Sequence, residues 1–130
     1  MTPMTLEQQR AADAWRATTA CTEAYAKLCK GVPALIMNSG LMQTLAFLEE
    51  KASKGEAHHA ALASQLRSWL GMQFPELLKA RNGQDPGYEA VMEALLHAEP
   101  QQFQSVTSEA LAWLRWIRQI APTRVGGRSS

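Results

Sequence analysis

The chain has 130 residues, of which 46% are hydrophobic and 19% charged, and its 13 basic and 12 acidic residues give a formal net charge of +1. This balance indicates one globular domain, and so small a basic surplus argues against strong nucleic-acid binding by the isolated chain. No apolar run approaches the ~20 residues of a membrane span, and the N-terminus lacks a signal-peptide apolar core. We therefore expect a cytoplasmic protein without membrane contact.

The N-terminal segment shows helical periodicity. Thr5 followed by Gln8 forms a capping-box pattern, which is typical of a helix start. Apolar residues then recur at i, i+3 and i+4 for five turns, and Lys30-Gly31 is typical of a helix end. This pattern predicts one helix over residues 5–30.

The apolar run over residues 32–48 is interrupted once. Pro33 suits the first turn of a short second helix, which Asn38-Ser39-Gly40 stops. We expect Gly40 to adopt a positive φ at this junction, because glycine has no Cβ to oppose it. A third helix is predicted over residues 41–54.

The second half of the chain also predicts helices and loops. A fourth helix is predicted over residues 56–70, followed by a break at 71–75, a turn or two at 76–81 and a loop at 82–87. A fifth helix is predicted over residues 88–98, with inward-facing Tyr88, Val91, Met92, Leu95 and Leu96. The last helix is predicted from Thr107, as its cap, to Ala121. The expected fold is all-α, a compact single-domain bundle of about six helices over residues 1–121, with a flexible tail at 122–130.

The last helix is unusually apolar. Its apolar residues cover an arc of roughly 220°, whereas a surface helix needs little more than about 100°. The helix is therefore either central in the bundle or covered on a second side by another chain. The second possibility makes Trp113, Trp116 and Ile120 candidate subunit-interface residues.

Catalytic and metal-binding patterns are not apparent. Cys21 and Cys29 fall on an apolar stripe, where a thiol is inert. The adjacent His58 and His59 project about 100° apart, and His97 stands alone, so we expect no metal site. No phosphate loop or nucleophile motif is present. We therefore predict a non-enzyme without a cofactor.

Basic residues are distributed unevenly. Arg16 and Lys27 are 11 residues apart, which places them within about 20° on one helix, and Lys30 lies one turn further. Arg115 and Arg118 form an i, i+3 pair in a C-terminal segment that has no acid after Glu109. These five cations are candidate RNA-binding residues, and ordinary solubilising charge is the alternative.

Four segments together resemble one family. They read TLEQQRAADAW (5–15), YAKLCKGVPALIMNSGLMQTLAFL (25–48), QLRSWL (65–70) and TSEALAWLRWIRQIA (107–121). In this order they resemble the small all-helical subunit of the type III-B CRISPR effector, the RNA-guided Cmr complex of antiviral defence. The resemblance covers nearly the whole chain and is mainly a packing signature.

This resemblance implies a non-catalytic subunit. Such subunits stack into a minor filament beside the backbone subunits that hold the crRNA, and they help to bind target RNA, which the backbone subunits cleave. The implied partners are other Cmr subunits, further copies of this chain, crRNA and target RNA. The alternatives are a small subunit of a type III-A or type I effector, and a helical adaptor or self-assembling bundle without RNA contact. An enzyme is the third and most distant alternative.

Overall fold

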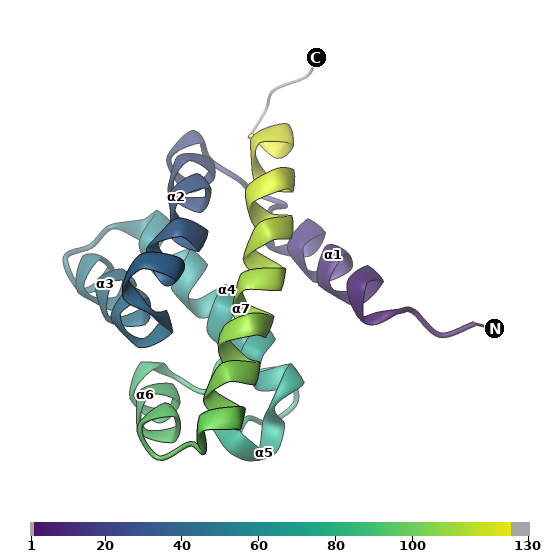
Figure 1. The fold of residues 1–130 in the computed structure, drawn as a ribbon. Helices are drawn as coiled ribbons and strands as arrows, with labels where there is room; N and C mark the ends of the chain where they lie inside the picture. The colour runs from purple at the N-terminus through teal and green to yellow at the C-terminus, as the bar shows by residue number, and fades with distance from the viewer. Residues whose placement is uncertain (1, 126–130) are drawn as a thin grey trace.

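The long C-terminal helix is the central element of the structure, a computed structural model that describes residues 2–125 (Figure 1). The elements, in chain order, are α1 (Leu6–Ala17), α2 (Glu23–Ser39), α3 (Leu41–Ser53), α4 (Ala57–Gln73), α5 (Pro75–Leu78), α6 (Tyr88–Leu96), α7 (Pro100–Ile120) and the 3-10 helix η1 (Ala121–Arg124). Residues 2–125 contain no strand. The predicted all-α, single-domain fold is confirmed.

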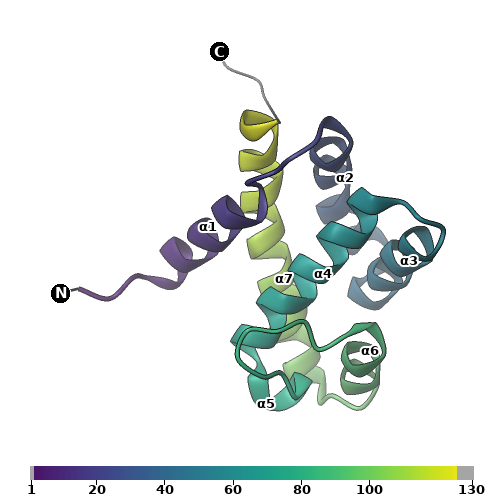
Figure 2. The ribbon, with the colours of Figure 1, turned by 180° about the vertical axis from the view of Figure 1, so that it is seen from behind.

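Helix α7 packs against α1, α2 and α4. Both views show α1 on the opposite side of α7 from α2 and α3, with α5 and α6 at the N-terminal end of α7 (Figures 1 and 2). The fully buried core follows α7 and the facing side of α4, where it contains Leu66, Leu70, Trp113, Leu114 and Ile117. Burial of this apolar surface is the main force that holds the bundle together.

The predicted first helix is in fact two helices. α1 ends at Ala17, where the Thr18 hydroxyl donates to the Ala14 carbonyl at 2.9 Å. α2 begins after Thr22, whose side chain accepts from the Tyr25 N–H at 3.1 Å. Because these threonines cap the two helix ends, the chain turns between them, and the prediction of a continuous helix over residues 5–30 is wrong.

Helix α2 continues through Gly31 and Pro33, so the predicted end at Lys30-Gly31 is also wrong. A proline inside a helix removes one hydrogen bond and costs about 3 kcal/mol. Here Pro33 is buried together with Cys29, Val32 and Ile36 on the same face of the helix. Burial of that continuous apolar face outweighs the local helix-breaking signals.

Gly40 alone separates α2 from α3. Its φ of 87° confirms the expected positive value, although the interruption is one residue long instead of three. The Gly40 N–H donates to the Ile36 carbonyl at 2.7 Å, and the Gly40 carbonyl accepts from the Thr44 hydroxyl at 2.9 Å. One glycine thus ends the first helix and starts the second.

Helix α4 extends three residues beyond its predicted end, through Gly71 to Gln73. The loop at 82–87 is present as predicted. It is fastened to α4 by the buried Arg67, which donates to both carboxylate oxygens of Asp85 at 2.9 and 2.8 Å. The side chains of Ala80 and Pro86 lie so close to Gly71 that a Cβ added there would be 2.9 Å from the Ala80 Cβ.

Helix α7 starts at Pro100, seven residues before the predicted cap. Glu99 and Gln102 form the capping box, and Pro100 occupies the first turn, where its missing N–H has no cost. Thr107 lies inside the helix, and its hydroxyl donates to the Phe103 carbonyl at 3.0 Å. Thr107 is therefore not a cap.

One smaller prediction also differs from the structure. Leu96, expected to point inward at the end of α6, is 66% exposed, whereas Val91 and Leu95 are buried as expected. The 3-10 helix η1 follows α7 to Arg124, and the flexible tail expected over residues 122–130 stays a prediction. Residues 126–130 of the predicted tail lie outside the described residues.

Candidate functional site

The apolar arc of α7 is covered within the chain. α1, α2 and α4 all contact this helix, and η1 packs at its C-terminal end. Of the two possibilities raised by the arc of roughly 220°, a central position is the one that the structure shows. The width of the arc is therefore no longer evidence for a second chain.

Trp113 is a core residue, and its assignment to a subunit interface is corrected here. Its side chain is 0% exposed, and its indole N–H donates to Asp13 Oδ2 of α1 at 2.9 Å. A partner could reach it only by opening the core. Trp116 and Ile120 are half-buried and pack against the same core, so part of each side chain faces solvent.

Arg115 and Arg118 are exposed on α7. Their i, i+3 spacing places them about 60° apart, and Arg118 projects about 160° from Trp116. The two arginines and the half-buried Trp116–Ile120 pair therefore occupy different sides of the helix. Within residues 2–125, neither arginine has a carboxylate within 4.0 Å.

The other predicted cations lie on two helices. Lys27 and Lys30 are exposed on α2, and the described residues place no carboxylate within 4.0 Å of either. Arg16 lies on α1, where it forms an ion pair with Asp13. Because α1 and α2 are separate, the prediction that Arg16 and Lys27 share a helix face is wrong.

A buried ionic cluster joins α1, α4 and α7. Arg10 donates to both oxygens of Glu109 at 2.7 Å, and the Trp69 indole N–H donates to Glu109 Oε2 at 3.0 Å. The side chains of Arg10 and Glu109 are 21% and 9% exposed. The sequence analysis did not predict this cluster. The one feature that could have indicated it is Glu109, an acidic residue beside the apolar stripe of the last helix.

Arg10 and Glu109 of this cluster also line a surface cavity. This cavity of about 590 Å³ is lined by polar side chains of α7, including Gln104, Ser105 and Ser108, beside Arg10 and Glu109. The two charges neutralise each other, so the cavity offers hydrogen-bonding groups without a free charge.

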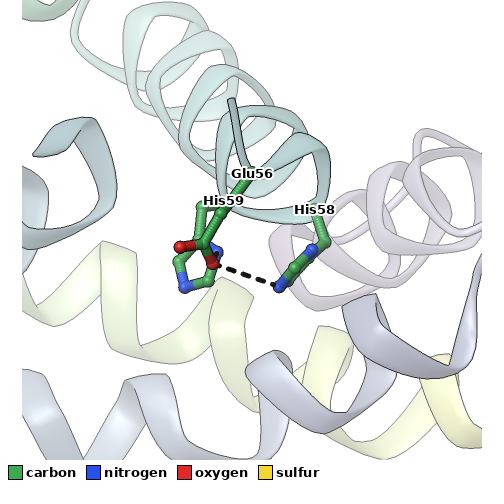
Figure 3. Close-up of side chains that lie close together, drawn as sticks. All are labelled: Glu56, His58 and His59. Atoms are coloured by element: carbon green, nitrogen blue, oxygen red, sulfur yellow. Dashed lines mark ion pairs between the residues drawn. The ribbon is translucent and has the colours of Figure 1, made fainter. Parts of the chain in front are cut away.

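Two histidines and a glutamate converge at the start of α4. Figure 3 shows the Glu56 carboxylate beside the His59 ring, with a dashed line from one of its oxygens to the His58 ring. Glu56 Oε1 lies 3.9 Å from His58 Nε2 and 3.1 Å from His59 Nδ1, and one ligand atom of each residue lies within 4.8 Å of the others. The two histidines, expected to project about 100° apart, therefore still bring one ring nitrogen each to the same carboxylate, that of the N-cap residue Glu56. The expectation that no metal binds here stays a prediction.

Burial lowers the pKa of His59, and the charges of His58 and Lys51 lower it further, whereas the nearby Glu56 carboxylate acts in the opposite direction. The ring of His59 lies edge-on to Phe47 of α3, with centroids 5.6 Å apart. A neutral imidazole held by an aromatic contact is in the form that can donate a lone pair.

The two thiols are inert. Burial raises the pKa of Cys29 to about 12 and also raises that of Cys21. Both side chains are buried, as expected, and a protonated, inaccessible thiol is not a nucleophile. None of the helices in residues 2–125 has both the length and the apolar character needed to cross a membrane.

Comparison with known proteins gives one consistent result. A model of the family described as CRISPR-associated protein (Cas_Cmr5) matches residues 6–123, which include α1 to α7. The chain is also similar to a solved structure, the X-ray crystal structure of a CRISPR-associated Cmr5 family protein from Thermus thermophilus. The two share 26% sequence identity with a TM-score of 0.73, and the match covers 95% of this chain and 99% of that protein. None of the curated protein sequences matches the chain.

Proposed function

The chain belongs to the CRISPR-associated Cmr5 family of small type III-B Cmr subunits, and from this membership we propose that it is a non-catalytic subunit of the minor filament that lines the path of target RNA. The observation that carries the proposal is the family match over residues 6–123. This match supports the type III-B system over the type III-A and type I alternatives. The other Cmr subunits are therefore its partners, and contacts with crRNA and target RNA are part of the proposal.

The exposed cations support a role along RNA. Lys27 and Lys30 on α2, with Arg115 and Arg118 on α7, lie on two helices that pack against each other. The described residues pair none of the four with a carboxylate, so their charge is available to phosphates. A groove assembled from several copies needs only a few cations from each, which agrees with a net charge of +1.

Charge reversal on α7 tests this role. In the assembled complex, Arg115→Glu with Arg118→Glu should weaken target-RNA binding. Affinity falls with salt, and a plot of log affinity against log salt concentration should become less steep. The magnitude of its slope should decrease by about 0.7 for each RNA phosphate that the variant no longer neutralises. The measurement is a binding titration with target RNA at several salt concentrations.

The matched control is Lys79→Glu with Arg81→Glu, the same charge change at exposed residues near α5. These substitutions should leave both the affinity and the slope close to wild type. If the α7 variant behaves like this control, Arg115 and Arg118 do not line the RNA path.

An adaptor without RNA contact is the second candidate, favoured by the half-buried Trp116 and Ile120. It predicts that Trp116→Asp abolishes assembly with the other Cmr subunits while the α7 arginines are dispensable for RNA capture. Co-purification of the complex in the absence of RNA measures assembly, and circular dichroism establishes that the variant chain is folded. Normal assembly of a folded Trp116→Asp variant would remove Trp116 from the interface.

A further inference from the structure

The start of α4 carries a set of metal-ligand atoms that the family assignment does not use. Glu56 supplies a carboxylate oxygen, and His58 and His59 supply imidazole nitrogens, all within 4.8 Å of one another (Figure 3). Ligands of a tetrahedral zinc ion, each about 2.0–2.2 Å from the metal, lie about 3.3 Å apart. The pair of Glu56 Oε1 and His59 Nδ1 is already at 3.1 Å, so only the half-buried His58 ring must move to complete the set.

His59 Nδ1 needs a partner. The His59 side chain is only 9% exposed, and Nδ1 makes no hydrogen bond of acceptable geometry within residues 2–125, although Glu56 Oε1 is close. A buried polar atom without a partner is unfavourable. A lone pair that faces a carboxylate oxygen is also repelled unless a proton or a cation lies between the two atoms. A bound cation would satisfy both atoms at once.

Glu56 and His58 are free to act as ligands. Glu56 is the N-cap residue of α4, yet its side chain makes no capping hydrogen bond. His58 lines an open surface cavity of about 500 Å³ together with Thr22, Tyr25 and Gln65, so an ion can enter from solvent on that side. One neighbouring residue disfavours a bound cation: Lys51 of α3 carries a positive charge close enough to affect His59.

We propose that Glu56, His58 and His59 bind one divalent transition-metal ion of the zinc class. Imidazole ligands favour zinc, cobalt or nickel over magnesium or calcium, which prefer oxygen ligands. Three protein ligands leave a fourth position for water. The ion would tie the cap of α4 to its first turn and thereby stabilise the packing of α4 against α3.

Metal titration tests the site. The untagged full-length chain, treated with a chelator and dialysed, is titrated with ZnCl2 by calorimetry at neutral pH, and CoCl2 binding is followed by visible absorption. We expect one ion per chain and an increase in Tm with zinc. His58→Ala and Glu56→Gln should each weaken binding by at least about tenfold. Neither residue is in the core, so both variants keep the fold.

The controls are matched to these variants. His97→Ala removes an exposed histidine of the same chain, and Glu89→Gln neutralises an exposed acid, so both should bind zinc like wild type. Lys51→Ala should bind zinc more tightly, because it removes a positive charge near His59.

Three results would overturn the proposal. The first is no saturable binding of either metal, and the second is equal affinity in wild type, His58→Ala and Glu56→Gln. The third is a thiolate charge-transfer band with cobalt that disappears in Cys21→Ser, which would assign the metal to cysteine. The outcome is independent of RNA binding by the complex, so failure here leaves the proposed subunit role unaffected.

Discussion

Gly71 and Gly31 are both inside helices, and the structure predicts opposite effects of alanine at the two positions. In α4, a Cβ at Gly71 would lie 2.9 Å from the Ala80 Cβ and 3.2 Å from the Pro86 Cγ. In α2, a Cβ at Gly31 would have nothing within 4 Å. Gly71 is buried and Gly31 is exposed. The same substitution therefore meets a packed segment in one helix and open space in the other.

Two contributions to the unfolding free energy, helix propensity and overpacking, can be estimated separately at these sites. Glycine to alanine in a helix interior stabilises by about 0.8–1.0 kcal/mol, and this gain is common to both sites. Overpacking costs about 1–3 kcal/mol, and it applies only at Gly71 because the Ala80 Cβ is held directly by the backbone and cannot rotate away. Gly31→Ala should therefore be more stable than wild type by about 1 kcal/mol. Gly71→Ala should be less stable than Gly31→Ala by about 1–3 kcal/mol.

Urea unfolding of the isolated chain, followed by circular dichroism, measures both free energies. At about 4 °C per kcal/mol for a chain of this length, the two variants should differ in Tm by roughly 4–12 °C. Equal stability of the two variants would refute the close approach of Ala80 and Pro86 to α4. Unchanged m-values would show that the substitutions leave the surface exposed on unfolding unchanged.

Three further substitutions test other contacts. Glu109→Gln should destabilise the chain by about 2–3 kcal/mol in urea unfolding, less than for a fully buried pair because Arg10 still reaches solvent. Burial would raise the pKa of Asp85, but hydrogen bonds from Arg67 and the Gly87 N–H outweigh it and lower the pKa. The stabilisation by Asp85 is therefore complete above the unfolded pKa and is lost as the pH falls through the folded value, so Asp85→Asn should flatten the decline in unfolding free energy below about pH 5. Gly40→Ala should cost about 1–3 kcal/mol in the same assay, because its φ of 87° and ψ of 163° lie in a region that only glycine adopts readily. The cost comes from the backbone alone, since a Cβ there would meet no atom within 4 Å.

Glu89→Gln serves as the control for both acidic residues, since Glu89 is exposed on α6. It should change neither the stability at neutral pH nor the acid dependence. A Glu109→Gln variant as stable as this control would mean that the Arg10–Glu109 pair does not hold α1 on α7. A Gly40→Ala variant as stable as wild type would mean that the junction tolerates a different φ.

The parts of the site that could be predicted from sequence are those on exposed helix faces. Lys27, Lys30, Arg115 and Arg118 are exposed where the charge pattern placed them. Trp113 could not be placed, because an apolar arc has the same pattern whether it faces a partner or the core of its own chain. The ion pair between Arg10 and Glu109, which are 99 residues apart, could not be predicted either, because pairing across a bundle depends on how the helices pack.

The sequence by itself determined the features that depend on neighbours a few residues away. These are the helical period, the capping box at Thr5, the positive φ at Gly40, the loop at 82–87 and the family resemblance. The tertiary structure alone decided that α2 passes through Pro33, that α4 passes through Gly71 and that Trp113 is internal. The reason is energetic. A local helix-breaking signal costs about 1–3 kcal/mol, whereas each large apolar side chain buried along a face contributes about 1.5–3 kcal/mol, so several together override it.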